Sequence, residues 1–403
     1  MSPEVHERQE PNAESKELHP IQVSECAWGI ELGTHSLKVL RLGCDFKQNR
    51  IAALSFDIVK LEGVQTKRNG GMGQMGTALA RVLERHEIGD DRVAMVVSDP
   101  TALLNFCEIP ATDVKKLHDL VTYEARIQIP IPLENVVWDY QNFSHEDVKQ
   151  NVVGGMDLLC LAALRYDRFD AALTPFDEVG VAVDIVQLAP AALFNYAKYD
   201  EIAGAGDDEP LMMLDMNTKA TTTTIIDGSK IWRRTFGMGG DDFTKALAKL
   251  HGLSPASAEL MKRNLAKSPN PGEVLESLRP VFEAYSAEVL RTMRQFSSTE
   301  RNVRLVAMGS GFQLPALAKY IQKKVGYPVE RLERFRRIDC SLIEGQPLFR
   351  ESLSSLAGCC GLALQALGKG RLTLNLIPDA IRPKRSRTAS RSFSWFGRGK
   401  SRN

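Results

Sequence analysis

The sequence lacks several features that would each identify a particular class of protein. It has no apolar run of the roughly 20 residues that a membrane-spanning helix needs; the longest apolar stretches, 156–164 and 356–367, are too short. Its seven cysteines are odd in number and include no CxxC pair, which favours buried thiols in a reducing cytoplasm over a disulfide framework. Its seven histidines show neither HExxH nor HxxxH spacing, so a metal site built only from protein ligands is not expected.

An excess of charge of either sign is missing as well. The formal net charge is +1, so the composition gives no reason to expect specific nucleic acid binding. A hydrophobic content of 43% and a charged content of 25% are ordinary for a globular protein. Because 403 residues exceed what one core supports, we expect two or more lobes. Residues 1–24 are polar, without an apolar stretch of signal-peptide length, and we expect a disordered leader there.

A strand, a polar turn and a second strand are predicted within residues 28–42. The turn offers Gly33 for close backbone approach and the hydroxyl groups of Thr34 and Ser36, which suits a phosphate group. Glu31 would place a carboxylate at the same point, where a metal ion bound to phosphate could sit. The alternative is an ordinary hairpin with a polar turn.

A second copy of this pattern occurs in the other half of the chain. Residues 214–218 again run from a strand into a polar turn, and 223–230 supply another strand that ends in an Asp-Gly pair typical of type I′ turns. The two copies align at an offset of 184 residues (215 − 31), which pairs Glu31 with Asp215, Gly33 with Asn217 and Thr34 with Thr218. This repetition indicates a duplicated fold that holds a nucleotide between its two halves.

Strands and helices alternate through both halves, which predicts an α/β protein. Their order from about residue 28 to 367 resembles the PilM family, the actin-like proteins of the type IV pilus inner-membrane platform. It is more distantly similar to FtsA and other actin-fold ATPases. The passages that carry the resemblance are 29–38, 109–125 with 129–130 and 139–140, 239–244, and 306–311 with 314–315.

The resemblance implies an actin-like (ribonuclease H-like, duplicated) fold of two lobes with an extra subdomain of the FtsA and PilM type. The implied parts are the leader 1–24, a first lobe 25–210 with the extra subdomain at about 105–181, a second lobe 211–370 with a helical insertion at about 246–300, and an extended segment with a basic tail at 371–403. The implied function is a cytoplasmic scaffold of a type IV pilus or type II secretion platform, which binds ATP and Mg²⁺ between the lobes. Its implied partners are the N-terminal peptide of a PilN-like bitopic membrane protein and other platform proteins at the inner membrane.

The same resemblance assigns candidate site residues. The cofactor-binding candidates are Gly33, Thr34, His35, Ser36, Lys38, Asp215, Asn217, Thr218, Gly239, Gly240, Gly309, Ser310 and Gly311. Glu31 and Asp215 are the candidates for holding Mg²⁺ through water, and Gln187 is a weak candidate for positioning a catalytic water. Local alternatives remain for several of these: a turn cap for Asp215, a helix start for Gly239 and Gly240, and a solvated strand residue for Lys38.

The chain departs from the family pattern at three positions. The family usually has Asp where this chain has Glu31, Gly where it has Asn217, and a second Gly where it has Met308. A longer carboxylate and an added side chain would both disturb contacts to magnesium and phosphate, so ATP binding that is kept, weakened or lost all remain open. Hydrolysis is expected less than binding. The competing hypotheses are an actin-fold ATPase or kinase, and a protein-binding module without nucleotide.

The C-terminal region holds two further signals. Residues 371–378 are similar to the short Asn-Leu-Leu-Pro segment by which PilN docks into PilM, which makes partner-docking candidates of Leu374, Asn375, Leu376, Ile377 and Pro378. We weigh an edge strand of the second lobe against occupation of the partner site, its own or a neighbour's, by strand addition. Residues 382–403 carry eight Lys or Arg and no acidic residue, which suits a disordered tail or an anionic membrane surface. Self-association also stays open.

Overall fold

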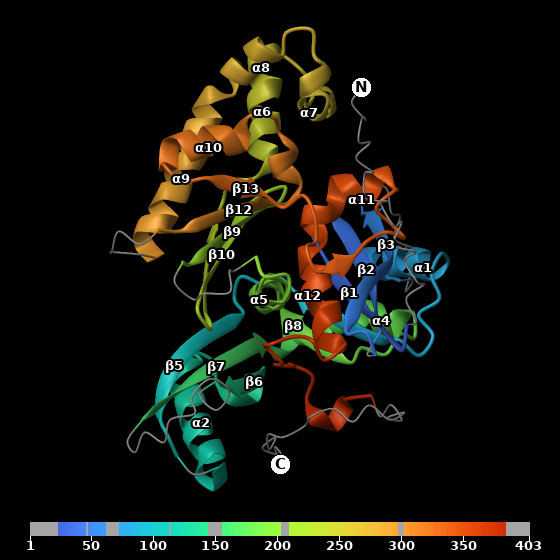
Figure 1. Ribbon diagram of the computed structural model, residues 1–403, viewed down its shortest axis with the longest axis vertical. Helices are drawn as coiled ribbons and strands as arrows, with labels where there is room; N and C mark the ends of the chain where they lie inside the picture. The colour runs from blue at the N-terminus through green and yellow to red at the C-terminus, as the bar shows by residue number, and fades with distance from the viewer. Residues whose placement is uncertain are drawn as a thin grey trace, which may run out of the picture.

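A computed structural model describes residues 23–45, 47–61, 72–112, 114–143, 155–202, 209–296 and 302–383. Most of the expected leader and of the basic tail lies outside these ranges. Within them no helix is both long and apolar enough to cross a membrane. The chain forms two lobes and an additional small subdomain, which Figure 1 shows with the second lobe above, the first lobe on the right and the subdomain below.

The first lobe is built on a sheet of six strands in the order β14-β3-β2-β1-β4-β8. The strands are β1 (Glu25–Leu32), β2 (Ser36–Asp45), β3 (Arg50–Lys60), β4 (Arg92–Val97), β8 (Ile185–Leu188) and β14 (Ile338–Asp339). Helices of the same lobe are α1 (Gln74–Leu83), α4 (Tyr166–Glu178), α5 (Ala189–Tyr199), α11 (Pro347–Ser352) and α12 (Ala357–Ala366), the last preceded by the 3₁₀ turn η4 (Leu353–Leu356). β1, β2 and β3 run antiparallel, whereas β4 and β8 continue the sheet in parallel.

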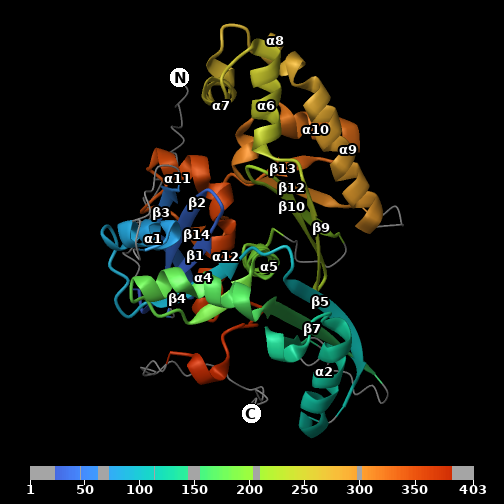
Figure 2. The ribbon, with the colours of Figure 1, turned by 180° about the vertical axis from the view of Figure 1, so that it is seen from behind.

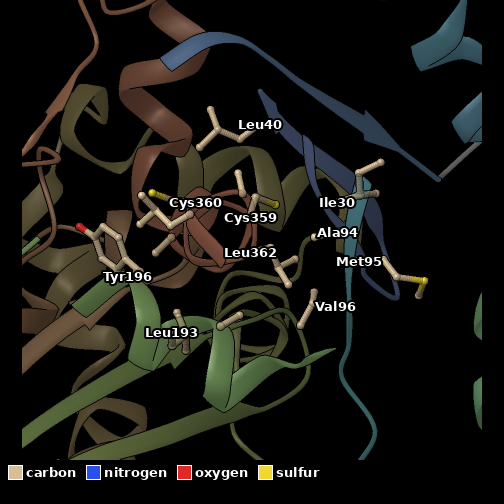
Figure 3. Close-up of a cluster of buried hydrophobic side chains, with 14 of the residues drawn as sticks. Ile30, Leu40, Ala94, Met95, Val96, Leu193, Tyr196, Cys359, Cys360 and Leu362 are labelled. Atoms are coloured by element: carbon tan, nitrogen blue, oxygen red, sulfur yellow. The ribbon is translucent and has the colours of Figure 1, made fainter. Parts of the chain in front are cut away.

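Helix α12 is apolar on every side and therefore needs to be buried on every side. It lies between β1 and α5, where Cys359, Cys360 and Leu362 meet side chains from both neighbours (Figure 3). Two glycines permit this close packing, because a Cβ at Gly29 would lie 1.8 Å from the Cys359 carbonyl oxygen, and one at Gly361 would lie 1.8 Å from that of Ala192.

The second lobe repeats the plan of the first. Its sheet has the order β11-β10-β9-β12-β13. The strands are β9 (Leu211–Met216), β10 (Thr221–Asp227), β11 (Lys230–Phe236), β12 (Arg304–Met308) and β13 (Val329–Arg331). The helices are α6 (Gly240–His251), α7 (Pro255–Arg263), α8 (Pro271–Ser277), α9 (Arg279–Phe296) and α10 (Leu317–Val325), with 3₁₀ turns η2 (Leu265–Lys267) and η3 (Ser310–Gln313). The antiparallel trio β9, β10 and β11 corresponds to β1, β2 and β3, and the parallel β12 and β13 correspond to β4 and β8. The duplication expected from the repeated pattern is thus present in the topology.

The inserted subdomain has its own sheet and its own small core. β5 (Leu103–Pro110), β7 (Met156–Arg165) and β6 (Val136–Asn142) form a three-stranded antiparallel sheet. Helix α2 (Val114–Gln128) covers it and buries Val121 and Ala125 against Leu159 and Leu161; the short η1 (Leu133–Asn135) leads into β6. Seen from behind, this unit extends away from both lobes (Figure 2).

Several boundaries differ from those expected. The expected second lobe ran to residue 370, but β14 pairs with β3 and α12 packs on β1, so the chain from 338 onward rejoins the first lobe. The expected subdomain ran to 181, but α4 packs on α1 of the first lobe. These differences arise from tertiary burial, which local patterns do not encode.

Candidate functional site

Two equivalent hairpin turns define the candidate site. In the β1–β2 turn the Gly33 N–H donates to the Ser36 carbonyl at 3.0 Å. In the β9–β10 turn the Asn217 N–H donates to the Ala220 carbonyl at 3.0 Å. The acidic residues expected at the ends of β1 and β9 occupy equivalent places, since Glu31 pairs with Lys38 in its ladder and Asp215 pairs with Thr222, again 184 positions further on.

Lys38 links the two hairpins electrostatically. Its Nζ atom lies 2.9 Å from Glu31 Oε1, and the two side chains are only 11% and 19% exposed. Burial alone would lower the pKa of Lys38, but the charges of Glu31 and of Asp215 from the other lobe raise it above its usual value. The ammonium group is therefore held in its charged form by its ion pair with Glu31 and by the charge of Asp215 from the other lobe.

Asp215 completes this charge cluster. Burial raises the pKa of its carboxyl group, the charge of Lys38 opposes that rise, and the charge of Glu31 adds to it. The Asn217 side chain donates a hydrogen bond to Asp215 Oδ2 at 3.1 Å. The structure thus brings together three residues that the sequence placed in separate halves of the chain: Glu31, Lys38 and Asp215.

The candidate phosphate contacts at the start of α6 are engaged within the chain in this conformation. The N–H groups of Gly240 and Asp241 donate to the carbonyls of Asn217 and Thr218 at 2.9 and 2.8 Å. The Gly239 N–H donates to Asp242 Oδ2 at 2.8 Å. A Cβ at Gly239 would lie 2.6 Å from the Asn217 and Thr218 carbonyl oxygens, so the close approach of turn and helix requires glycine. A phosphate group at these amides would have to replace the turn carbonyls.

The glycines after β12 support the end of β9. Gly309 has φ +86°, and a Cβ there would lie 2.5 Å from the Met216 carbonyl oxygen and 2.7 Å from Asp215 Oδ1. A Cβ at Gly311 would lie 2.1 Å from Met216 Sδ, whereas Ser310 between them is exposed. These glycines let the loop pack against the strand that carries Asp215, and their expected adenosine contact stays a prediction.

The residues at the two turns fit a magnesium-bound phosphate in their chemistry. Glu31 and Asp215 supply the carboxylate oxygens that Mg²⁺ prefers, usually through water; of the two hydroxyl residues of the first turn, Thr34 is exposed and Ser36 is partly buried. The buried His35 Nε2 atom has no hydrogen-bond partner among the described residues, which leaves one polar atom in the first turn for a ligand. The described residues contain no group of three or more His, Cys, Asp or Glu that could hold a metal without such a ligand.

Sequence reasoning missed a polar cluster beside the start of α6. Lys262 Nζ donates to the Gly240 carbonyl at 3.0 Å and lies 2.6 Å from Glu259 Oε2. Thr244 Oγ1 donates to the same Glu259 oxygen at 2.6 Å. Burial alone would raise the pKa of Glu259, but hydrogen bonds from Lys262, Thr244 and Arg263 lower it to about 2. The only local signal was the i, i+3 spacing of Glu259 and Lys262 on α7.

Gln187 lies two strands from Glu31 in the sheet of the first lobe, since both residues are in register with Val96 of β4. It is fully buried in β8, where its Nε2 donates to the Leu374 carbonyl at 2.8 Å and its Oε1 accepts from the Leu188 N–H at 2.9 Å. Both ends of the amide are therefore engaged in holding the chain together. We assign Gln187 a structural role in place of the catalytic one.

A cavity of about 460 Å³ lies elsewhere in the first lobe. It is lined by Trp28, Arg41, Ser55 and residues 85–91. None of the candidate site residues contributes to it, so the cavity has no part in the interpretation of the hairpin turns.

Solved structures with the same arrangement were found by comparison. A protein chain from a PilM–PilN type IV pilus biogenesis complex is 22% identical, with 85% of this chain and 98% of that chain covered, at a TM-score of 0.66. The ethanolamine utilization protein EutJ from Carboxydothermus hydrogenoformans is 14% identical, covering 84% and 89%, at 0.47. MreB5 of Spiroplasma citri bound to ADP is 12% identical, covering 82% and 98%, at 0.45.

The likeness to the chain of the PilM–PilN complex, at a TM-score of 0.66, together with the duplicated sheet topology, confirms the predicted fold class, an actin-like fold of two α/β lobes with an additional subdomain. The family model described as type IV pilus assembly protein PilM matches residues 29–367. That range includes both hairpin turns, the inserted subdomain and α12. The chain therefore belongs to the PilM family of type IV pilus assembly proteins.

Proposed function

We propose that the chain is a scaffold of a type IV pilus platform that binds ATP with Mg²⁺ between its two hairpin turns. Glu31 and Asp215 would hold the hydrated metal ion, and the turns around Gly33 and Asn217 would face the phosphates. The bound metal ion would neutralise phosphate charge. Nucleotide would act as a conformational ligand that changes how the lobes close and so changes affinity for a partner.

The observation that carries this proposal is the convergence of the two hairpins on one ammonium group. Lys38 Nζ lies 2.9 Å from Glu31 Oε1 of the first lobe, and the charge of Asp215 from the second lobe also raises the pKa of this ammonium group. Two facing carboxylates at the ends of equivalent strands form a site that attracts a cation and its anionic ligand.

Calorimetry with ATP and Mg²⁺ tests the proposal directly. The parent chain should release binding heat, and Asp215→Ala should lose it. Asp119→Ala, at an exposed position on α2, is the matched control and should bind like the parent. Absence of binding heat in the parent under conditions where circular dichroism shows a folded chain would refute nucleotide binding.

A second candidate function is partner binding without nucleotide. It is favoured by the same site, because Lys38 already forms an ion pair with Glu31 and the α6 amides already donate to the carbonyls of the β9–β10 turn. In that case ATP and Mg²⁺ should leave the affinity for the partner's N-terminal peptide unchanged. The first proposal requires this affinity to change.

For the partner we propose a PilN-like membrane protein, whose N-terminal peptide binds the chain at the inner face of the membrane. The support is the likeness to a chain from a PilM–PilN complex and membership of a pilus assembly family. We further propose a cytoplasmic location with membrane attachment through that partner. A pull-down of the full-length chain with a PilN-type N-terminal peptide, against the same peptide with its Asn replaced by Ala, tests the interaction.

A further inference from the structure

Residues 371–378 lie between the first lobe and the inserted subdomain of their own chain. Figure 1 shows this part of the chain running from below α12 toward β6. The segment belongs to none of the three sheets that the described residues form, so the expectation of an edge strand in the second lobe is wrong. Leu372, Leu374 and Leu376 are buried in the core of the first lobe, while Thr373 is exposed.

Side-chain amides hydrogen-bond the backbone of the segment from both sides. Asn195 on α5 accepts from the Leu372 N–H at 2.7 Å and donates to the Leu372 carbonyl at 2.8 Å. Gln141 on β6 accepts from the Thr373 N–H at 2.7 Å and donates to the Arg371 carbonyl at 2.9 Å. Each amide thus occupies both a donor and an acceptor of the extended backbone, as a neighbouring strand would.

Two more side-chain amides and a carboxylate hydrogen-bond the backbone of the next two residues, Leu374 and Asn375. Gln187 and Gln365 both donate to the Leu374 carbonyl, at 2.8 and 2.7 Å. Asp139 Oδ2 accepts from the Asn375 N–H at 2.8 Å. Because all these bonds go to main-chain atoms, they hold an extended peptide regardless of most of its side chains.

One side chain of the segment is selected individually. Asn375 Oδ1 accepts from the Val186 N–H at 3.0 Å, and Asn375 Nδ2 donates to the Asp184 carbonyl at 2.9 Å. The next residue, Leu376, donates its N–H to the Val186 carbonyl at 2.9 Å. Only an amide of this length satisfies both backbone groups, so the site selects Asn flanked by apolar residues.

We call the surface formed by Asp139, Gln141, Val186, Gln187, Asn195 and Gln365 the docking site. Asp139 and Gln141 come from the inserted subdomain and the other four from the first lobe, so an occupant joins these two units. The strand addition expected from the sequence is reduced to one backbone bond, from Leu376 to Val186, among those described. Side chains make the remaining contacts to the segment backbone.

We propose that residues 371–378 are an internal ligand of the docking site, and that a partner peptide with the pattern apolar-x-apolar-Asn-apolar-apolar binds there only by displacing them. Of the proposed function, this inference depends only on the proposal of a PilN-like partner. The occupant's chemistry follows from the segment already seated there: alternating aliphatic side chains, one Asn and an extended backbone. The chain therefore regulates partner binding through its own C-terminal region.

The test uses the full chain with a specific protease site inserted between Gly368 and Lys369. Gly368 is exposed in a turn with φ +72°, so cleavage there leaves the segment bound but no longer covalently attached. The probe is a fluorescently labelled synthetic peptide of residues 371–383. Uncut chain should bind it at least tenfold more weakly than cut chain, in which the labelled peptide exchanges for the native segment.

Two matched controls assign the binding to the docking site. A probe with Asn375→Ala leaves the Val186 N–H and the Asp184 carbonyl without this partner and should bind at least tenfold more weakly. Gln141→Ala in the cut chain, at a partly exposed position, should weaken the parent probe as well. Circular dichroism of each protein shows that it remains folded.

Three outcomes would overturn the proposal. Unfolding of the chain on cleavage would make the segment an integral part of the core. Equal probe binding by cut and uncut chain would place the probe elsewhere. The third outcome is that the chain's own peptide exchanges but a peptide with Asn-Leu-Leu-Pro in place of residues 375–378 does not. That result would refute displacement by a partner peptide, while residues 371–378 would still be an internal ligand. The comparison of cut and uncut chain uses only the chain's own peptide. If it fails, the proposed function is therefore not refuted.

Discussion

Replacing Lys38 with methionine tests whether the contact between the hairpins stabilises the protein. The variant keeps the apolar stem of the side chain and removes only the ammonium group, so packing on β2 changes little. What remains is a pair of carboxylates, Glu31 and Asp215, in largely buried surroundings without their cation. Stability should fall, and a divalent cation should restore part of it.

The size of the effect follows from the geometry. At the 2.9 Å separation of Lys38 Nζ and Glu31 Oε1, the attraction is about 6 kcal/mol for an effective dielectric constant of about 20. Desolvation of the two groups offsets much of this, but removing a single partner leaves an uncompensated charge, which typically costs about 3–5 kcal/mol. Lys38→Met should therefore lower the free energy of unfolding by that amount.

Urea unfolding followed by circular dichroism measures this loss. Removing the Glu31 carboxylate, which Lys38→Met leaves without its cation, should reduce this loss. Glu31→Gln combined with Lys38→Met should therefore be about 2 kcal/mol more stable than Lys38→Met alone. Millimolar Mg²⁺ should raise the midpoint of Lys38→Met more than that of the parent. Lys249→Met, at an exposed position on α6, is the control and should stay within about 0.5 kcal/mol of the parent.

A loss for Lys38→Met no larger than that of Lys249→Met would refute the argument. So would a double variant that is less stable than the sum of its two single changes. Either result would mean that the two acidic turns do not share the ammonium group in solution.

Two further predictions concern the second lobe. Gly309→Ala should lower the free energy of unfolding by about 2–3 kcal/mol, because φ is +86° and the new Cβ would lie 2.5 Å from the Met216 carbonyl oxygen. Gly345→Ala is the control, since a Cβ there would have nothing within 4 Å, and it should be neutral in the same urea assay. Equal losses for the two variants would contradict this prediction. Glu259→Gln should cost about 1–2 kcal/mol above pH 4.5, after allowance for solvent screening. The lowered pKa of Glu259 means that its contribution is complete above the unfolded value of 4.5 and disappears as pH falls through about 2. Unfolding measured from pH 7 to pH 2 should therefore show parent and variant converging in acid; a constant difference would contradict the assignment.

Local patterns were sufficient for the repeated hairpins. Alternating apolar residues around small polar turns depend only on neighbours in the sequence, and the constant offset between Glu31 and Asp215 is enough to reveal the duplication. The resemblance extended this to the family, and the family model covers nearly the same residues, 29–367.

Contacts between segments far apart in the chain could not be predicted from local sequence patterns. Nothing within 357–366 states that this helix returns to the first lobe, because an evenly apolar helix has no face that points to a particular neighbour. Gln187 gave a similar difficulty, since its polar side chain in a connecting strand suited both catalysis and a buried hydrogen bond. Its partner Leu374 is 187 residues away in sequence.

Helix α12 connects the two sites described above. Near its start, a Cβ at Gly358 would lie 3.2 Å from Glu31 Oε2, and Cys359 Sγ donates to the Lys38 carbonyl at 3.5 Å. Near its end, Gln365 donates to Leu374 of the docked segment. Seven residues of helix, about 10 Å at 1.5 Å per residue, thus separate the acidic turn from the docking site. Because Gly29 and Gly361 pack α12 without slack against β1 and α5, a shift of Glu31 large enough to move the start of the helix also moves Gln365. The proposed exchange of the segment and the proposed rearrangement of the hairpin turns would therefore both act on helix α12.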